Sequence, residues 1–157
     1  RLESIDFSEL VREGVLEYRD ESNGHGHKIE LTSNNESLVV NGDREGLRRV
    51  VRNLVENAVK YSPNAETVWV ETGCEKRAAV LRVRDEGIGI PPEEQSRIFE
   101  KFVRGDAPKQ ACIPGTGIGL AMVQEIVRVH QGKLDLDSEV GRGSTFVVRL
   151  PLQESYS

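Results

Sequence analysis

The sequence predicts an α/β fold, a two-layer α/β sandwich with a mixed, largely antiparallel sheet and helices on one face. Three observations favour it: strongly amphipathic helical segments, short runs rich in branched residues, and the closeness of neighbouring runs along the chain, which suits hairpins. A length of 157 residues with 37% hydrophobic residues fits one domain that buries its own core.

The strongest predicted helix lies before the middle of the chain. From Leu47 to Val59, apolar residues recur at i, i+3, i+4, i+7, i+8, i+11 and i+12, and Asp43 precedes them as a good N-cap. The Ser62-Pro63 pair ends this helix. A second helix is expected to continue through residues 123–130, and a short amphipathic helix is expected within residues 2–20.

The remaining regular elements are strands. The polar, glycine-interrupted stretch 21–27 is expected to be a loop. Branched and alternating residues predict strands at 28–32, 38–41, 67–72, 78–84, 133–137 and 144–150.

Composition excludes several classes of function. The net charge is −5, without a basic block, so no nucleic-acid partner is expected. No apolar run approaches the roughly 20 residues that cross a bilayer, so this segment is not expected to insert into a membrane. Cys74 and Cys112 stand far apart and outside any ligand cluster, which is typical of reduced cytosolic thiols.

One edge of the strongest helix carries polar side chains. On a helical wheel, Asn53, Asn57, Lys60 and Tyr61 fall between about 220° and 320°, beside the apolar stripe. An amide oxygen can ligate Mg²⁺, a lysine can neutralise phosphate, and a tyrosine ring can lie against a purine. A solvated polar edge explains the same pattern, because nothing in the spacing demands a ligand.

A carboxylate follows a buried strand. Leu81, Val83 and Asp85 share one face because side chains alternate along a strand, so Asp85 is aimed toward the apolar layer. Such a carboxylate needs donors, and Gly87 and Gly89 allow the backbone to approach something closely. The amino group of adenine is one such donor. Alternatively, Asp85 caps its own turn.

Alternate glycines lead into the second helix. The segment PGTGIGLAM, residues 114–122, offers backbone amides and a positive helix end to an anion. It matches neither the GxGxxG fingerprint nor a P-loop. Residues 103–114, with Lys109 and Arg104, have the composition of a loop that folds over phosphate, or of an ordinary surface loop.

In chain order, these segments resemble the five sequence boxes of two-component sensor histidine kinases. Residues 53–62 (NLVENAVKYS) resemble the N box, 85–90 (DEGIGI) the first glycine box, 98–104 (IFEKFVR) the Phe box, and 114–121 (PGTGIGLA) and 141–146 (GRGSTF) the later glycine boxes. The resemblance extends from about residue 6 to residue 152.

The resemblance implies the Bergerat ATP-binding fold, with ATP and Mg²⁺ as cofactors. It implies that Asn57 is the Mg²⁺ ligand, that Asp85 binds the adenine amine, and that Thr145 sits behind the adenine. The catalytic residues it implies are Asn53, Asn57, Lys60 and Arg104. The nucleotide-binding residues it implies are Asn53, Asn57, Lys60, Tyr61, Asp85, Gly87, Gly89, Ile90, Arg104, Gly115, Thr116, Gly117, Gly119, Leu120 and Thr145.

Two absences shape the expected activity. The ATPase relatives carry a water-activating Glu four residues before the metal-binding Asn, and here Asn53 occupies that position. None of His25, His27 and His130 stands in the family's phosphoacceptor motif. The resemblance therefore implies transfer of the γ-phosphoryl group to a His on a separate dimerisation and phosphoacceptor domain, for relay to a response regulator.

The implied organisation has three parts: residues 1–20 as a connector with a first helix, 21–152 as the catalytic ATP-binding domain, and 153–157 as a C-terminal tail. The implied location is the cytoplasm, as part of a parent kinase that can be anchored in the inner membrane. Two alternatives stay open, a serine kinase of the anti-sigma type and a degenerate module that senses ATP without transferring phosphate.

Overall fold

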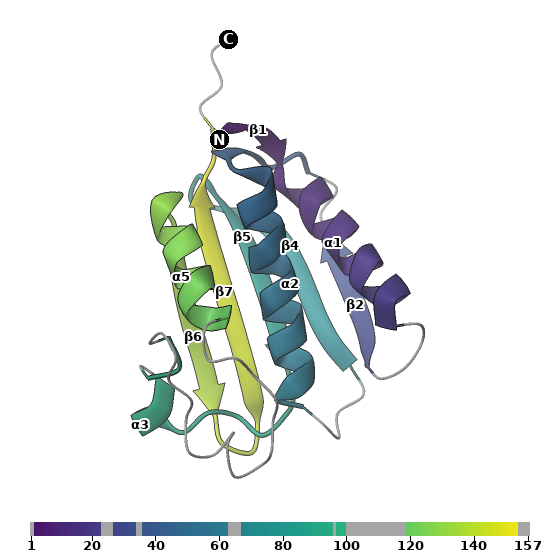
Figure 1. Cartoon of the computed structure of the whole chain (residues 1–157), viewed down its shortest axis with the longest axis vertical. Helices are drawn as coiled ribbons and strands as arrows, with labels where there is room; N and C mark the ends of the chain where they lie inside the picture. Colours follow the sequence, from purple (N-terminus) through teal and green to yellow (C-terminus); the bar gives the residue numbers. More distant parts are fainter. Residues whose placement is uncertain are drawn as a thin grey trace.

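The computed structural model describes residues 2–22, 27–33, 36–62, 67–95, 97–99 and 119–153. Helices α1 (Phe7–Ser22), α2 (Arg44–Lys60) and α5 (Gly119–Val129) lie side by side over one face of a five-stranded sheet (Figure 1). The predicted two-layer α/β sandwich is confirmed.

The sheet is mixed, as predicted. Its strands run in the order β2-β4-β5-β7-β6, where only the β2–β4 pair is parallel. The strands are β2 (Lys28–Ser33), β4 (Thr67–Glu75), β5 (Ala78–Asp85), β6 (Lys133–Glu139) and β7 (Gly143–Pro151). Two short elements, α3 (Pro92–Gln95) and the 3₁₀ turn η1 (Arg97–Phe99), follow β5 along the chain.

The N-terminal segment belongs to the same core. Residues 3–6 do not join the expected helix but form β1 (Glu3–Asp6), which pairs antiparallel with β3 (Val39–Gly42). The Asp6 carboxylate accepts hydrogen bonds from the backbone N–H groups of Ser8 and Leu38, each at 3.2 Å, so it fixes the start of α1. Five buried side chains from this segment belong to the main hydrophobic core: Ile5, Phe7, Leu10, Val11 and Val15.

Helix α2 is built as its pattern predicts. The Asp43 carboxylate accepts a hydrogen bond from the backbone N–H of Gly46 at 3.2 Å, which makes Asp43 the N-cap. The apolar stripe is buried, and α1 crosses it closely, because a Cβ at Gly14 would lie 3.0 Å from Val51 Cγ1. None of the helices in the described part of the chain is long and apolar enough to cross a membrane.

His130 joins the end of α5 to the start of α2. Its Nε2 accepts a hydrogen bond from the backbone N–H of Asp43 at 2.9 Å. Nδ1 lies 2.7 Å from the carbonyl oxygen of Ile126, and because that oxygen can only accept, Nδ1 carries the proton. His130 thus links the two helices through both of its ring nitrogens.

We expect His130→Ala to lower the free energy of unfolding by about 1–3 kcal/mol, because the Asp43 N–H loses its acceptor in a partly buried position. Urea denaturation measures the change. Val129→Ala, at the neighbouring position that is 61% exposed, is the matched control and should shift stability by less than about 0.5 kcal/mol. Equal effects in the two variants would contradict the bridge.

Candidate functional site

The predicted site residues that the structure describes gather at one end of the sandwich. At this end, at the bottom of Figure 1, α2 ends, α5 begins, β6 turns into β7, and α3 lies beside that turn. The last residue of β5, Asp85, lies in the middle of this end.

Asp85 is a buried carboxylate, being 2% exposed. Burial raises its pKa to about 6, while backbone hydrogen bonds from Gly87 and Ser144 and the charges of His27 and Arg84 work in the opposite direction. The Gly87 N–H donates to Asp85 Oδ1 at 2.9 Å, so the carboxylate does cap its own turn. A carboxylate offers about four acceptor positions, which leaves capacity for a donor from a ligand. The two interpretations of Asp85 are therefore compatible.

The segment after β5 is held tightly on both sides. A Cβ at Gly87 would lie 1.9 Å from the carbonyl oxygen of Tyr61, and that oxygen accepts a hydrogen bond from Ile88 N–H at 2.9 Å. On the other side, Gly89 has a φ of +75°, and a Cβ there would lie 2.1 Å from the carbonyl oxygen of Glu139. Only glycine fits at either position, so residues 86–91 are wedged between the end of α2 and the β6–β7 turn.

The polar edge of α2 lines the site. The side-chain N–H of Asn53 donates to the Arg49 carbonyl at 2.8 Å, which directs its oxygen to α5, where a Cβ at Gly119 would lie 3.1 Å away. Asn57 has a buried side-chain nitrogen that finds no hydrogen-bond partner among the described residues. Lys60 is half-buried, and it pairs with no acidic side chain among the residues that the structure describes.

Tyr61 forms the C-cap of α2 and is half-buried. Burial raises the pKa of its hydroxyl, and the negative charge of the buried Glu94 on α3 raises it further. Tyr61 therefore stays neutral at physiological pH and offers the site a ring and a hydroxyl donor.

Two predicted site residues support the site from the core side. Ile90 is 2% exposed and Leu120 is 8% exposed, and both belong to the hydrophobic core. Gly119 is the first residue of α5, so backbone N–H groups of that first turn lie next to Asn53.

The structure does not bring Thr145 to this site. Along β7, buried and half-buried residues alternate, and Ser144 is on the face that carries Asp85, whereas Thr145 is on the opposite, helix-free face. Ser144 is 3% exposed, pairs directly with Asp85, and lies 2.7 Å from Ser138 through their hydroxyl oxygens. Sequence reasoning missed Ser144 and Ser138, although period-two counting from Phe146 points to Ser144.

His27 is a second residue that sequence reasoning did not place here. Its Nε2 donates to the carbonyl oxygen of Ser62, directly behind Gly87, and its buried Nδ1 has no hydrogen-bond partner within the part of the chain that the structure describes. The sequence carries no local signal for this, since the contact joins positions 35 residues apart. The remaining predicted residues and the expected lid lie outside the described residues: Arg104, Gly115, Thr116, Gly117 and 103–114.

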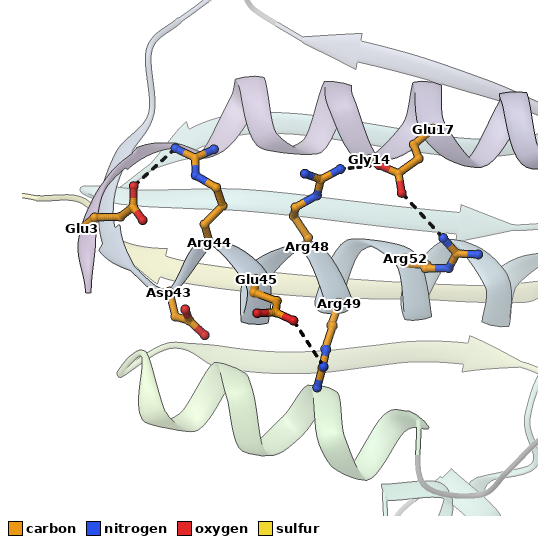
Figure 2. A pocket seen from close by; sticks show the side chains of 9 residues that line it. All are labelled: Glu3, Gly14, Glu17, Asp43, Arg44, Glu45, Arg48, Arg49 and Arg52. Carbon is orange, nitrogen blue, oxygen red and sulfur yellow. Dashed lines mark hydrogen bonds and ion pairs between the residues drawn. The ribbon is translucent and has the colours of Figure 1, made fainter. Parts of the chain in front are cut away.

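A groove of about 630 Å³ lies elsewhere, between α1 and the first half of α2 (Figure 2). The arginines that line the groove are paired with carboxylates of neighbouring residues. Arg44 pairs with Glu3 at 3.7 Å, and Arg48 and Arg52 both pair with Glu17 on α1 (Figure 2). We interpret this groove as a charged seam that ties α1 to α2, because its arginines are already engaged by carboxylates.

Comparison with known proteins agrees with the geometry. Residues 42–154 match the family described as histidine kinase-, DNA gyrase B-, and HSP90-like ATPase. Sensor-like histidine kinase SenX3 of Mycobacterium tuberculosis is 35% identical over 97% of this chain and 37% of its own length. Circadian input-output histidine kinase CikA of Synechococcus elongatus is 39% identical over 80% of this chain and 17% of its own length. The chain thus spans well under half of these relatives.

Solved structures agree as well. The mycobacterial sensor histidine kinase MprB superposes with a TM-score of 0.81 at 31% identity, over 99% of this chain and 100% of that one. Full-length ShkA in complex with AMPPNP superposes with a TM-score of 0.82 at 25% identity, over 99% of this chain and 32% of that one. The chain belongs to the histidine kinase-, DNA gyrase B- and HSP90-like ATPase family, and the relatives and structural neighbours named here are sensor histidine kinases.

Proposed function

We propose that this chain binds Mg·ATP and is the catalytic domain of a sensor histidine kinase, which transfers the γ-phosphoryl group to a His on a separate domain. The observation that carries the proposal is the buried Asp85 carboxylate at the end of β5, which is next to the wedged segment 86–91 and accepts a hydrogen bond from its Gly87 N–H. A carboxylate can accept a hydrogen bond from the adenine amine.

The residues present fit a Mg²⁺ ion bound together with phosphates. Across the described ranges, no group of three or more His, Cys, Asp or Glu residues could hold a metal ion alone. Mg²⁺ commonly takes few protein ligands and completes its shell with water and phosphate oxygens. The unpartnered amide of Asn57 is suited to this role, since its oxygen can ligate the ion and its nitrogen can donate to a phosphate. When bound, Mg²⁺ would neutralise the charge on the transferring phosphoryl group.

In this proposal, the chain contributes positioning and charge. Asp85 orients the base, Asn57 holds the metal, and Lys60 and Arg104 neutralise phosphate charge. Asn53, which stands where the ATPase relatives have Glu, has an amide that cannot deprotonate water, so hydrolysis should be slow.

The acceptor histidine is proposed to lie on another domain. Both ring nitrogens of His130 are engaged, by Ile126 and Asp43, and His27 is engaged by the Ser62 carbonyl. The other ring nitrogen of His27, Nδ1, is buried, so neither ring offers an accessible nucleophile. The proposed partners are therefore a dimerisation and phosphoacceptor domain of the same parent kinase and a downstream response regulator, in the cytoplasm.

The first prediction concerns the ionisation of Asp85. Because the adenine amine binds the carboxylate and not the acid, ADP should lower the pKa of Asp85 from its value of about 6 in the free protein. Nucleotide affinity should accordingly weaken as the pH falls through that value. Carbon-13 NMR of the side-chain carboxyl measures the midpoint, and Asp85→Asn identifies the signal by removing it.

Pyrophosphate with Mg²⁺ is the control for this titration, because it carries the charge of a nucleotide without the base. It should leave the midpoint of Asp85 unchanged. A folded Asp85→Asn variant that binds ADP like the wild type, or the same midpoint with and without ADP, would remove Asp85 from the base site.

The second prediction concerns the metal. Asn57→Ala should weaken the Mg²⁺-dependent part of ATP binding roughly tenfold or more, because a ligand or charge-assisted hydrogen bond of about 1.5–3 kcal/mol is lost. Calorimetry with Mg²⁺ and with EDTA separates that part. Glu56→Gln, on the side of α2 that pairs with Arg52, is the matched control and should keep the full Mg²⁺ dependence. An unchanged Mg²⁺ dependence in Asn57→Ala would exclude the assigned role.

The third prediction concerns phosphoryl transfer. Incubated alone with radiolabelled ATP, the chain should label itself negligibly, whereas addition of the phosphoacceptor domain should give an acid-labile phosphoprotein on that domain. The rate should rise with concentration, because the two pieces are not tethered. Strong acid-labile label on this chain alone would refute an acceptor on another domain, and acid-stable label would favour a serine kinase.

A further inference from the structure

His27 reaches the proposed base site from the edge of the sheet. It directly precedes β2, which pairs parallel with β4, and in that register Ile29 lies beside Val68, which in turn pairs with Asp85. His27 stands two residues before Ile29, so it lies at the same end of the sheet as Asp85. From there its Nε2 donates a hydrogen bond to the carbonyl oxygen of Ser62, just after the end of α2.

Ser62, which accepts this hydrogen bond, joins α2 to the wedged segment 86–91. It is fully buried, and its hydroxyl donates to the carbonyl oxygen of Ala58 at 2.6 Å, within the last turn of α2. Gly87 packs directly on Ser62, because a Cβ at Gly87 would lie 2.6 Å from Ser62 Cα. The hydroxyl thus ties Ser62 to the helix, while His27 holds its carbonyl oxygen. A buried carbonyl that loses its donor is unfavourable, so without His27 this peptide group would turn toward another donor.

Gly87 transmits the position of Ser62 to Asp85. Its N–H donates to Asp85 Oδ1 at 2.9 Å, and the following N–H, that of Ile88, donates to the carbonyl oxygen of Tyr61 at 2.9 Å. A turn of the Ser62 peptide would move the surface on which Gly87 rests. Because a hydrogen bond weakens steeply when its geometry is lost, such a shift would weaken the bond to the carboxylate.

The far end of the wedged segment is held by different contacts. The Ile90 N–H donates to the hydroxyl oxygen of Ser138 at 2.7 Å, and the side-chain nitrogen of Gln95 donates to the Ile90 carbonyl oxygen at 2.9 Å. Both backbone polar groups of Ile90 are therefore engaged by β6 and α3. The contact with Ser62 acts at the other end of the segment, where the donor to Asp85 lies.

We propose that His27 is a positioning residue: by holding the Ser62 carbonyl, it keeps the Gly87 N–H on the Asp85 carboxylate and so orients that carboxylate for the nucleotide. The inference rests on the proposed function. His27 acts through Ser62 and Gly87 and does not itself touch the nucleotide. Its buried Nδ1 has no hydrogen-bond partner among the residues that the structure describes, so the donor at Nε2 is the group through which the ring acts.

Amide hydrogen exchange measures the effect in the protein without nucleotide. His27→Ala should speed the exchange of the Gly87 N–H about fivefold to tenfold, as expected when one hydrogen bond is weakened. The Gly46 N–H is the internal control, because it donates to the Asp43 carboxylate at the opposite end of α2 and should keep its wild-type rate. Calorimetry with Mg·ADP should show a loss of affinity of about fivefold to tenfold as well.

His27→Gln keeps a side-chain N–H donor and should restore both values. The charge of His27 also acts on Asp85, and glutamine carries no charge, so rescue by Gln assigns the effect to the hydrogen bond. Lys28→Gln, at the exposed neighbouring position that pairs with Glu30, is the matched control and should match the wild type. If His27→Ala fails to fold, His27→Phe fills the space of the ring without a donor and should give the same changes.

Three results would overturn the positioning role while the proposed function stands. The first is an unchanged Gly87 exchange rate, or unchanged ADP affinity, in a folded His27→Ala or His27→Phe variant. The second is an equal acceleration at Gly87 and Gly46, which would indicate a general loss of stability. The third is a His27→Gln variant that behaves like His27→Ala. A wild-type chain that does not bind Mg·ADP would overturn the proposed function and this role together.

Discussion

Keeping the carboxylate of Asp85 buried at the end of β5 is the constraint on which the rest of this site depends. A buried carboxylate is unfavourable unless donors reach it, and here they come from the backbone N–H groups of Gly87 and Ser144. Those donors are in place only because residues 86–91 turn back sharply and β7 begins directly alongside. A side chain at Gly143, where φ is +104° and a Cβ would lie 2.1 Å from the carbonyl oxygen of Asp85, would separate the two strands.

Helix α2 links the core, the N-terminal helix and the site because it presents a different face to each. Its apolar stripe packs on the sheet, its arginine face forms the charged seam with α1, and its Asn53–Tyr61 edge faces the start of α5. Seam ion pairs between exposed side chains contribute little each. Burial of the stripe and the Asp43 cap, with His130 behind it, therefore fix the position of α2 and so the position of Asn57.

Local periodicity predicted much of the fold and part of the site. The 3.6-residue period placed the edge of α2 correctly, and the two-residue period correctly turned Asp85 toward the helices. Contacts between segments that are far apart in the sequence could not be predicted from local periodicity. Residues 3–6 form a strand because β3 is available as a partner, and His27, Gln95 and Ser138 acquire their roles from contacts with distant segments. Thr145 shows a further limit of sequence reasoning. Neighbouring residues along a strand point to opposite faces of the sheet, so a prediction that is off by one residue selects the opposite face.

Two neighbouring rows of side chains on the helix-covered face of the sheet differ in polarity. Val70, Val83, Phe146 and Leu136 pair across four strands as an apolar row, and the next row is Val68, Asp85, Ser144 and Ser138. Because neighbouring rows share the same backbone, the packing of the apolar row sets the spacing of the polar one. The edge-to-face contact of Phe146 with Phe99, at 6.3 Å between ring centres, extends that apolar row to the turn after α3. The apolar row thus fixes the positions of the polar side chains next to it. A substitution at Phe146 in the core therefore changes the site by changing the spacing of these side chains.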